Sequence, residues 1–334
     1  MIRRSLISLL FLFAAAPLGA DTAWEGYITV GAKYNSNIEY LYLIDRLSRA
    51  DPPIKEGFFA TLSGDIALVL GEEYQGRISY SLVSESGIDH PELSRFDQYL
   101  GGAFSHVFNE KLLLDCSILL HHVAERWPTP RQLYVDLFGW ATLLYDHNEY
   151  FSSYFTARTG YYHDIDPFTD RRLDYFRGPS AGIEGGWYVY PAADPSYIKT
   201  SGGVDLNWFR DEEFDLYADE RNDTLGVSNK YLRIVAMLEG AFIYDPFTLS
   251  LAVRYTFQYW LGIDTFRYLD WEKRRLEHSV YLLPEFEYRF LERYAVRAGF
   301  SIMKKISNIG ENKNDYTDYS LVQFTGGASF TFSF

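Results

Sequence analysis

The 334-residue chain contains 1 Cys and 3 Met, and it lacks the long apolar runs of a helical membrane protein. The single Cys116 excludes an internal disulfide, because a disulfide needs two thiols. After residue 20, no stretch approaches the roughly 20 apolar residues that a membrane-spanning helix needs. Basic residues are also scarce, with 31 Lys and Arg against 45 Asp and Glu, which argues against nucleic acid as a partner. Aromatic residues, in contrast, make up 18% of the chain.

The first residues have the organisation of a secretory signal. Arg3 and Arg4 precede an apolar run from Leu6 to Ala16, and Pro17-Leu18-Gly19-Ala20 follows. A charged segment, a short apolar segment and a small residue before the cut predict a signal peptide over residues 1–20 and a mature domain over 21–334. The run is too short for the alternative, an uncleaved spanning helix. The cut removes two arginines, so the net charge changes from -14 to 29 - 45 = -16.

The last thirteen residues alternate strictly between two kinds of side chain. One parity is apolar and largely aromatic (Val322, Phe324, Gly326, Ala328, Phe330, Phe332, Phe334), and the other is small and polar (Gln323, Thr325, Gly327, Ser329, Thr331, Ser333). A period of two is that of a β-strand with one apolar face. An unpaired strand edge promotes aggregation, whereas a closed barrel pairs its last strand with its first. The ending therefore predicts a closed β-barrel.

Alternating segments of this kind recur about fourteen times. They lie near residues 26–34, 58–70, 74–83, 98–108, 111–121, 133–145, 150–162, 180–190, 197–209, 231–244, 249–259, 280–290, 294–303 and 322–334. Short connections such as 71–73 take turns with long polar ones such as 35–56, as in barrels with periplasmic turns and extracellular loops. We therefore predict an all-β, transmembrane, antiparallel up-and-down β-barrel of about 14 strands (roughly 12 to 16), with both termini periplasmic.

A soluble β-sandwich or propeller is the alternative fold. A sandwich needs no alternation of loop length, and a propeller would show repeats of about 40 to 45 residues, which we do not find. Pro284 is the one residue that argues against the barrel prediction, because it interrupts the segment 280–290 and removes a hydrogen-bond donor. In a closed barrel, this proline would need a bulge or a local gap in the pairing.

The alternating C-terminal strand that closes on Phe334 resembles the signature of bacterial outer-membrane β-barrels. By strand count, the chain is similar to the monomeric fourteen-stranded porins and to the long-chain fatty-acid channel family. The resemblance implies a location in the bacterial outer membrane, contact with outer-membrane lipid, and recognition of the strand ending at Phe334 by the barrel-assembly machinery.

If the apolar parity faces lipid, the other parity lines the lumen. The pore-lining candidates are Asp65, Arg77, Asp115, Asp136, Arg158, Glu184, Lys199, Asp205, Arg233, Glu239, Arg254, Glu285, Glu287, Arg289 and Arg297. Both signs occur in similar numbers, which predicts weak ion selectivity, and the same residues could instead form a salt-bridge lattice that stiffens the wall. Large inward aromatics would narrow the lumen or offer a platform to solutes: Tyr134, Phe138, Trp140, Tyr150, Tyr154, Tyr162, Tyr188 and Tyr281.

These features predict a porin-like channel for passive or weakly selective passage of small solutes. One alternative is a structural or surface-interaction barrel that acts through its loops. Another is an outer-membrane enzyme, for which His121, His122 and His163 are candidates near strand ends. His121 and His122 cannot serve one lumen site, because adjacent strand residues point to opposite faces. No cofactor or metal site is predicted, since the acidic segment 210–229 lacks the spacing of a calcium loop.

Overall fold

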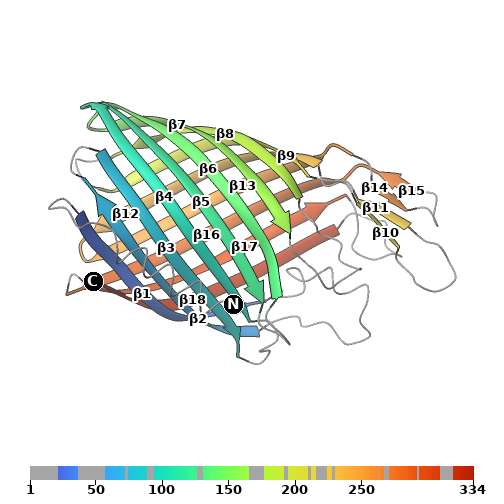
Figure 1. Ribbon diagram of the computed structural model, residues 1–334, viewed down its shortest axis with the longest axis horizontal. Coiled ribbons are helices and arrows are strands. Elements are labelled where there is room, and N and C mark those ends of the chain that lie inside the picture. Colours follow the sequence, from blue (N-terminus) through green and yellow to red (C-terminus); the bar gives the residue numbers. More distant parts are fainter. Residues whose placement is uncertain are drawn as a thin grey trace.

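Fourteen strands form a closed antiparallel barrel in the computed structural model, as Figure 1 shows. The structure describes residues 22–36, 57–71, 74–88, 94–125, 131–164, 177–191, 195–209, 212–215, 224–227, 230–262, 264–266, 271–291, 293–308 and 319–334. The predicted signal peptide lies outside these residues. The predicted fourteen-stranded, all-β barrel is confirmed.

The barrel strands are long, and successive strands in the chain are neighbours in space. They are β1 (Thr22–Asn35), β2 (Gly57–Leu70), β3 (Tyr74–Gly87), β4 (Arg95–Asn109), β5 (Leu112–Glu125), β6 (Arg131–Asn148) and β7 (Phe151–Asp164). The second half holds β8 (Arg177–Val189), β9 (Tyr197–Trp208), β12 (Lys230–Tyr244), β13 (Phe247–Trp260), β16 (Leu276–Phe290), β17 (Tyr294–Ser307) and β18 (Tyr319–Ser333).

The terminal strands close the barrel as the sequence predicts. β1 pairs with β18 over nine positions, from Tyr27 opposite Ser333 to Asn35 opposite Thr325. Next to the Tyr27–Ser333 pair, the Phe334 amide donates to the Gly26 carbonyl at 2.9 Å, and the Gly26 amide donates to the Phe334 carbonyl at 3.2 Å. The last residue is therefore part of the seam, and the barrel has no free edge there.

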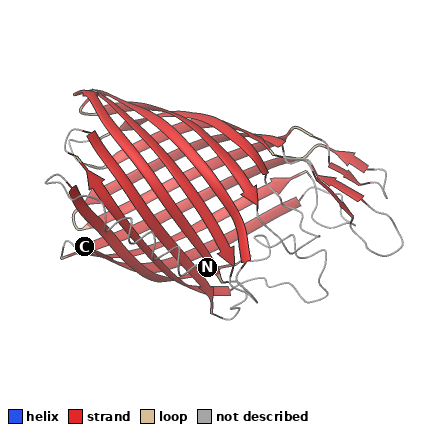
Figure 2. Cartoon of the chain, in the orientation of Figure 1, coloured by secondary structure: helices blue, strands red, loops and turns tan. Residues whose placement is uncertain are grey.

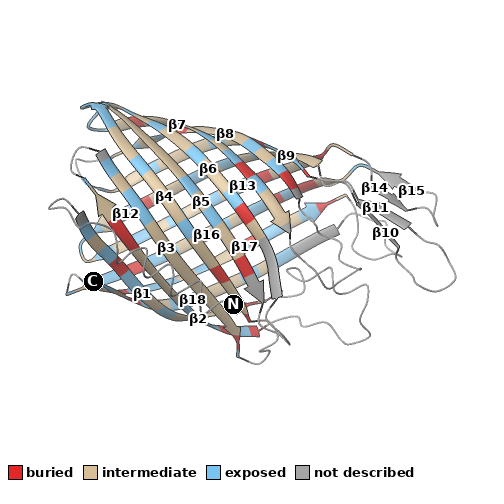
Figure 3. Cartoon of the chain, viewed as in Figure 1, coloured by how far each residue is buried: buried red, intermediate tan, exposed pale blue. Residues whose placement is uncertain are grey.

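Side chains alternate between an exposed outer face and the lumen along each barrel strand. The outer face is apolar, and Phe242, Leu249 and Ile183 expose 59%, 56% and 53% of their surface. Figure 3 shows exposed and less exposed residues taking turns along the strands. A closed barrel with an apolar outer surface and polar groups inside suits a lipid bilayer, because lipid covers the outer face and closure pairs the backbone of every strand on both sides. The chain is thus an outer-membrane β-barrel.

Pro284 lies in β16 and is accommodated by a gap in one ladder. It is paired with Leu251 of β13, but on the other side the β16–β17 ladder passes from the pair Leu282–Ile302 to the pair Glu285–Gly299. The register is the same on both sides of the gap. Because Pro284 has no amide hydrogen to donate, the pairing is interrupted locally, but the register of the strand does not shift.

Two long connections carry a second, small sheet that the sequence did not predict. β10 (Glu212–Asp215) and β11 (Thr224–Val227) lie between β9 and β12, whereas β14 (Asp264–Phe266) and β15 (Trp271–Lys273) lie between β13 and β16. The four strands pair in the order β10-β11-β14-β15 beyond one end of the barrel (Figure 2). In the described part of the chain, no helix is long and apolar enough to cross a bilayer.

Candidate pore-lining site

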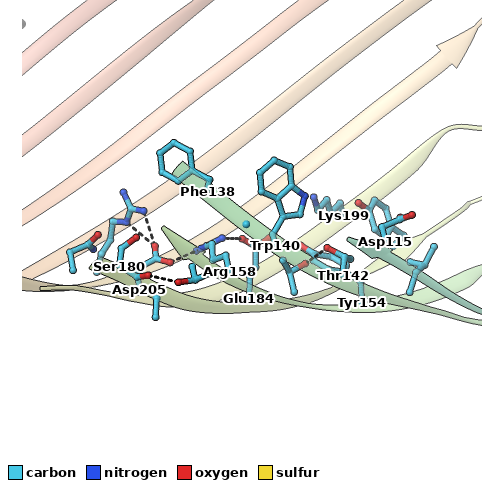
Figure 4. A pocket seen from close by; sticks show the side chains of 18 of the residues that line it. Asp115, Phe138, Trp140, Thr142, Tyr154, Arg158, Ser180, Glu184, Lys199 and Asp205 are labelled. Carbon is cyan, nitrogen blue, oxygen red and sulfur yellow. Dashed lines mark hydrogen bonds and ion pairs between the residues drawn. The ribbon is translucent and has the colours of Figure 1, made fainter. Parts of the chain in front are cut away.

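A cavity of about 620 Å³ lies against the lumen wall formed by β6, β7, β8 and β9. Six of the predicted pore-lining residues line it: Asp115, Arg158, Glu184, Lys199, Asp205 and Arg233. Five of the predicted inward aromatics also line it: Phe138, Trp140, Tyr154, Tyr162 and Tyr188. Figure 4 shows the charged side chains in a row along the wall, with the rings of Phe138 and Trp140 standing away from the strands. The structure therefore brings together the residues that the sequence placed on one parity of these strands.

Asp205 holds two arginines on the wall. Arg158 donates from Nε to Asp205 Oδ1 at 2.5 Å, and Arg233 donates from Nε to Asp205 Oδ2 at 2.9 Å. Arg158 also donates from Nη1 to Glu184 Oε2 at 2.9 Å. The Asp205 side chain is 6% exposed, whereas both arginine side chains are about a third exposed. Partly exposed pairs contribute only about 0–1 kcal/mol each, so the main effect of this ladder is to fix the arginines in place.

A glycine makes this ladder possible. Gly182 of β8 stands in register between Arg158 of β7 and Asp205 of β9. A Cβ atom on Gly182 would lie 2.0 Å from Asp205 Oδ1, which no real structure tolerates. Because residue 182 has no side chain, the carboxylate of Asp205 reaches over β8 to the guanidinium of Arg158.

Lys199 lies in a cluster of tyrosines beside the ladder. Its Nζ atom is 5.1 Å from the ring centroid of Tyr154 and 5.3 Å from that of Tyr188, within the range of a cation–π interaction. Tyr154 in turn donates its hydroxyl to Glu184 Oε1 at 2.7 Å. Among the described residues, no carboxylate lies within ion-pair distance of Lys199. Glu239 of β12 is the register partner of Lys199, so a carboxylate residue stands on the neighbouring strand without forming an ion pair with it.

A continuous row of rings crosses the wall where β6, β7, β9, β12 and β13 meet the long connections. Ring centroids are 5.2 Å apart for Phe138–Tyr162, 5.0 Å for Tyr162–Phe209, 5.9 Å for Phe209–Tyr231 and 4.7 Å for Tyr231–Trp260. The sequence pattern predicted the first two of these five rings, Phe138 and Tyr162, as inward aromatics. It did not predict the other three as part of the lumen lining. Phe209 is 2% exposed and follows the last residue of β9, although the predicted segment 197–209 already gave residue 209 the lumen parity.

The other predicted charges lie elsewhere on the wall, mostly in local pairs. Arg77 is 3.6 Å from Asp65 and 3.1 Å from Glu25, a partner that the sequence did not identify. Glu287 accepts from Arg289 at 2.5 Å and also from Arg297.

Further single contacts complete the predicted set. Glu239 accepts from the Tyr197 hydroxyl at 2.6 Å, and the Arg254 guanidinium lies 5.8 Å from the Tyr281 ring centroid. Glu285 is exposed, and no ion pair or side-chain hydrogen bond to it is found among the described residues. Tyr150 lies in the β6–β7 turn and not on a strand. These charges share the lumen parity with the cavity residues but do not gather into one site.

The adjacent histidines point to opposite faces of β5. His121 Nε2 is 3.0 Å from Asp97 Oδ1 and its Nδ1 is 3.6 Å from Asp136 Oδ2, while its ring stacks on Tyr99 at 4.3 Å. His122 instead bonds Gln98 at 3.1 Å on the outer face. Both rings have structural partners. In the described residues, no group of three His, Cys, Asp or Glu side chains is placed to hold a metal ion.

Comparison with known proteins gives a likeness to solved structures alone. No family model and no curated protein matches the chain. The solved structures that it resembles include the CymD monoaromatic hydrocarbon channel (12% identity, 92% of this chain and 88% of that one, TM-score 0.45). They also include the outer-membrane channel DcaP of Acinetobacter baumannii (11%, 96% and 99%, TM-score 0.45) and the Pseudomonas putida toluene transporter TodX (9%, 94% and 90%, TM-score 0.40). At these identities, the closed strand order and the outer apolar face define the fold.

Proposed function

We propose that the chain forms a channel that lets small solutes cross the outer membrane passively, with weak selectivity for charge. The observation that carries the proposal is the lumen cavity of about 620 Å³ and the balance of charge around it. Asp115, Glu184 and Asp205 offset Arg158, Lys199 and Arg233 on its lining. Such a wall favours neither cations nor anions strongly, because fields of opposite sign cancel over the width of a hydrated lumen.

The aromatic lining supports a size limit for the solute. Phe138, Trp140, Tyr154 and Tyr188 stand on one stretch of wall and reduce its free width. Barrels of about eight strands are filled by side chains, whereas those of sixteen or more enclose an aqueous channel. A fourteen-stranded barrel lies between these limits, so bulky side chains on one wall set the width.

The orientation follows from the lengths of the connections. We assign the short turns, such as the one at 149–150, to the periplasm and the long connections to the outside, which places Phe334 on the periplasmic side. The pairing of Phe334 with Gly26 supports a role for this residue in closing the barrel during assembly by the barrel-assembly machinery.

Single-channel recording in planar bilayers tests the channel. Purified protein should give stepwise conductance, and in a tenfold KCl gradient the reversal potential should lie near zero. A strongly selective reversal potential would contradict the balanced lining, and a folded barrel that gives no steps would contradict the channel itself. The small sheet of β10, β11, β14 and β15 favours a second function, surface interaction through these connections, if the barrel does not conduct.

A further inference from the structure

One end of the lumen cavity contains a buried amide whose hydrogen-bond donor is unused. Asn207 of β9 lines the cavity and is 2% exposed, and its Nδ2 atom has no hydrogen-bond partner among the described residues. Most buried polar side chains in proteins are hydrogen-bonded, so an amide of this kind needs an explanation. The cavity volume of about 620 Å³ lies within the range of small-molecule pockets, roughly 300–1,000 Å³. The unused donor therefore points to a ligand that brings an acceptor to this end of the cavity.

A row of register partners places an aromatic ring and a hydroxyl near this amide. Phe138 of β6 is the register partner of Gly160 of β7, which in turn pairs with Ser180 of β8. Ser180 pairs with Asn207 on the next strand. A Cβ atom on Gly160 would lie 2.9 Å from both Phe138 Cδ1 and Ser180 Oγ, so the ring and the hydroxyl both lie over the bare backbone of residue 160. We call Phe138, Ser180 and Asn207 the amide subsite.

The charges beside the amide subsite cancel. Asp205, two residues from Asn207 on β9, accepts from Arg158 through Oδ1 and from Arg233 through Oδ2. Glu184 accepts from Arg158, so two carboxylates offset two guanidinium groups. Both oxygens of Asp205 are therefore in use. The groups left for a ligand are donors: Nδ2 of Asn207 and Nη1 of Arg233, which bonds Asp205 through Nε and Nη2 and has no bond through Nη1 among the described residues.

These features together define a class of ligand. Spare donors beside charges that cancel suit an uncharged acceptor, because a free carboxylate would find no uncompensated cation at this end of the cavity. The rings of Phe138 and Trp140 stand away from the strands at the cavity (Figure 4) and offer their faces and edges to another aromatic ring. A plain hydrocarbon ring would leave the Asn207 donor unpaired, and a saccharide has no aromatic ring to pack against these two.

We propose that the amide subsite binds an uncharged aromatic ring whose edge carries a hydrogen-bond acceptor, such as a carbonyl oxygen. Asn207 donates to this acceptor, the Ser180 hydroxyl supplies a second hydrogen bond, and Phe138 packs against the ring. The inference deepens the proposed channel function and rests on it, because it names the class of solute that crosses. Binding is measurable without conduction, so the two proposals fail in different experiments.

Ligand binding to the detergent-solubilised full chain tests the proposal. The probes are nicotinamide, an uncharged ring with acceptors; nicotinate, the same ring with a negative charge; aniline, a ring with a donor on its edge; and glucose, which has no aromatic ring. Titrations followed by saturation-transfer NMR give the dissociation constants. Nicotinamide should bind about fivefold more tightly than each of the other probes, because one hydrogen bond between uncharged groups contributes roughly this factor in affinity.

Two variants separate the roles of the amide and the ring. Asn207→Leu keeps a branched side chain and removes the donor, so nicotinamide should bind about fivefold more weakly while aniline stays within about twofold. Phe138→Leu should weaken both nicotinamide and aniline, because both lose the contact between rings. Gln258→Leu is the matched control. It removes a lumen amide on β13 that does not line the cavity, and all affinities should stay within about twofold of the wild type.

Several results would overturn the proposal. Tighter binding of nicotinate than of nicotinamide would show that the site takes anions. Equal binding of aniline and nicotinamide by the wild type, or an unchanged nicotinamide affinity in Asn207→Leu, would show that the acceptor is not recognised. Glucose binding as tight as that of nicotinamide would show that the aromatic ring is not needed.

A comparison with conductance separates the two proposals. Protein that binds nicotinamide but gives no conductance steps would contradict the channel alone. Protein that conducts but does not bind nicotinamide would contradict the solute class alone. Circular dichroism of each variant checks that the barrel is folded, and the comparison of the probes on the wild type does not depend on any variant.

Discussion

Gly182 and Asp205 are register partners on β8 and β9, and the missing side chain of the first is what lets the second reach Arg158. A Cβ at residue 182 would lie 2.0 Å from Asp205 Oδ1 and 3.0 Å from the Val204 carbonyl oxygen. One atom at this position therefore decides whether the charge ladder of the lumen wall forms.

Gly182→Ala should destabilise the refolded barrel by about 1–3 kcal/mol, because the carboxylate of Asp205 must move and the neighbouring backbone leaves little room. Equilibrium unfolding in lipid vesicles measures the loss. Gly185→Ala in the same strand is the control, since a Cβ there meets its nearest atom, the Tyr154 carbonyl oxygen, at an ordinary 3.5 Å. Equal stability of the two variants would mean that the ladder does not restrain residue 182.

Arg158→Gln should shift the channel toward cations, and Asp205→Asn should shift it toward anions. Each change removes one charge from a lining that is otherwise balanced. A unit charge contributes about 1 kcal/mol at 4 Å in water, so the permeability ratio should change by roughly fivefold at most. Reversal potentials in a KCl gradient measure the shift. Shifts in the same direction for both variants would contradict the balance of charge that we describe.

Phe138→Ala and Trp140→Ala together should raise the single-channel conductance, because both rings stand in the lumen at the cavity. Leu137→Ala is the matched control: Leu137 is adjacent in β6, but it is 45% exposed on the outer face. Conductance at fixed KCl concentration measures the effect. A similar conductance in the double variant and the control would show that another part of the lumen limits the flow.

Val253→Lys should destabilise the barrel by about 2–4 kcal/mol, since residue 253 lies in the middle of β13 on the lipid face. Ala252→Lys places the same side chain one residue away in the lumen, opposite Glu239, and should be tolerated better. Unfolding of both variants in the same vesicles gives the comparison. The reverse order of stability would contradict our assignment of residue 253 to the lipid face and residue 252 to the lumen.

Phe334→Ala should lower the amount of barrel in the outer membrane of cells more than it lowers refolding in detergent. The backbone bonds of residue 334 to Gly26 remain in this variant, so the folded seam keeps its pairing. What changes is the aromatic side chain, which is 55% exposed and therefore open to recognition by the assembly machinery. Equal losses in cells and in detergent would assign the ring to stability alone.

The alternation of the sequence was enough to predict the class of fold, a strand number of about 14 and, for most strands, the face that is turned to lipid. It was enough because a strand has only two faces and lipid accepts only one kind of side chain. It also predicted that Pro284 needs a bulge or a local gap in the pairing, and the β16–β17 ladder has the gap.

The contacts within the lumen could not be predicted in the same way. Which charges meet depends on the stagger between strands, and parity does not determine stagger. Asp205 meets Arg158 across an intervening strand because residue 182 is a glycine, a relation that no single strand displays. Phe209 has the lumen parity of the predicted segment 197–209, but parity does not show that its ring meets those of Tyr162 and Tyr231 on other strands.

The small sheet ties two separate stretches of the chain into one surface element. β11 pairs with β14 through Leu225–Phe266 and Gly226–Thr265, so the connection after β9 and the connection after β13 share a hydrogen-bonded border. If one of these two stretches were replaced during evolution, the backbone groups of the other would lose their hydrogen-bond partners. With the long connections on the outside of the cell, as we propose, an antibody or phage that selects for change in this part of the surface should therefore select for paired changes, one in each stretch.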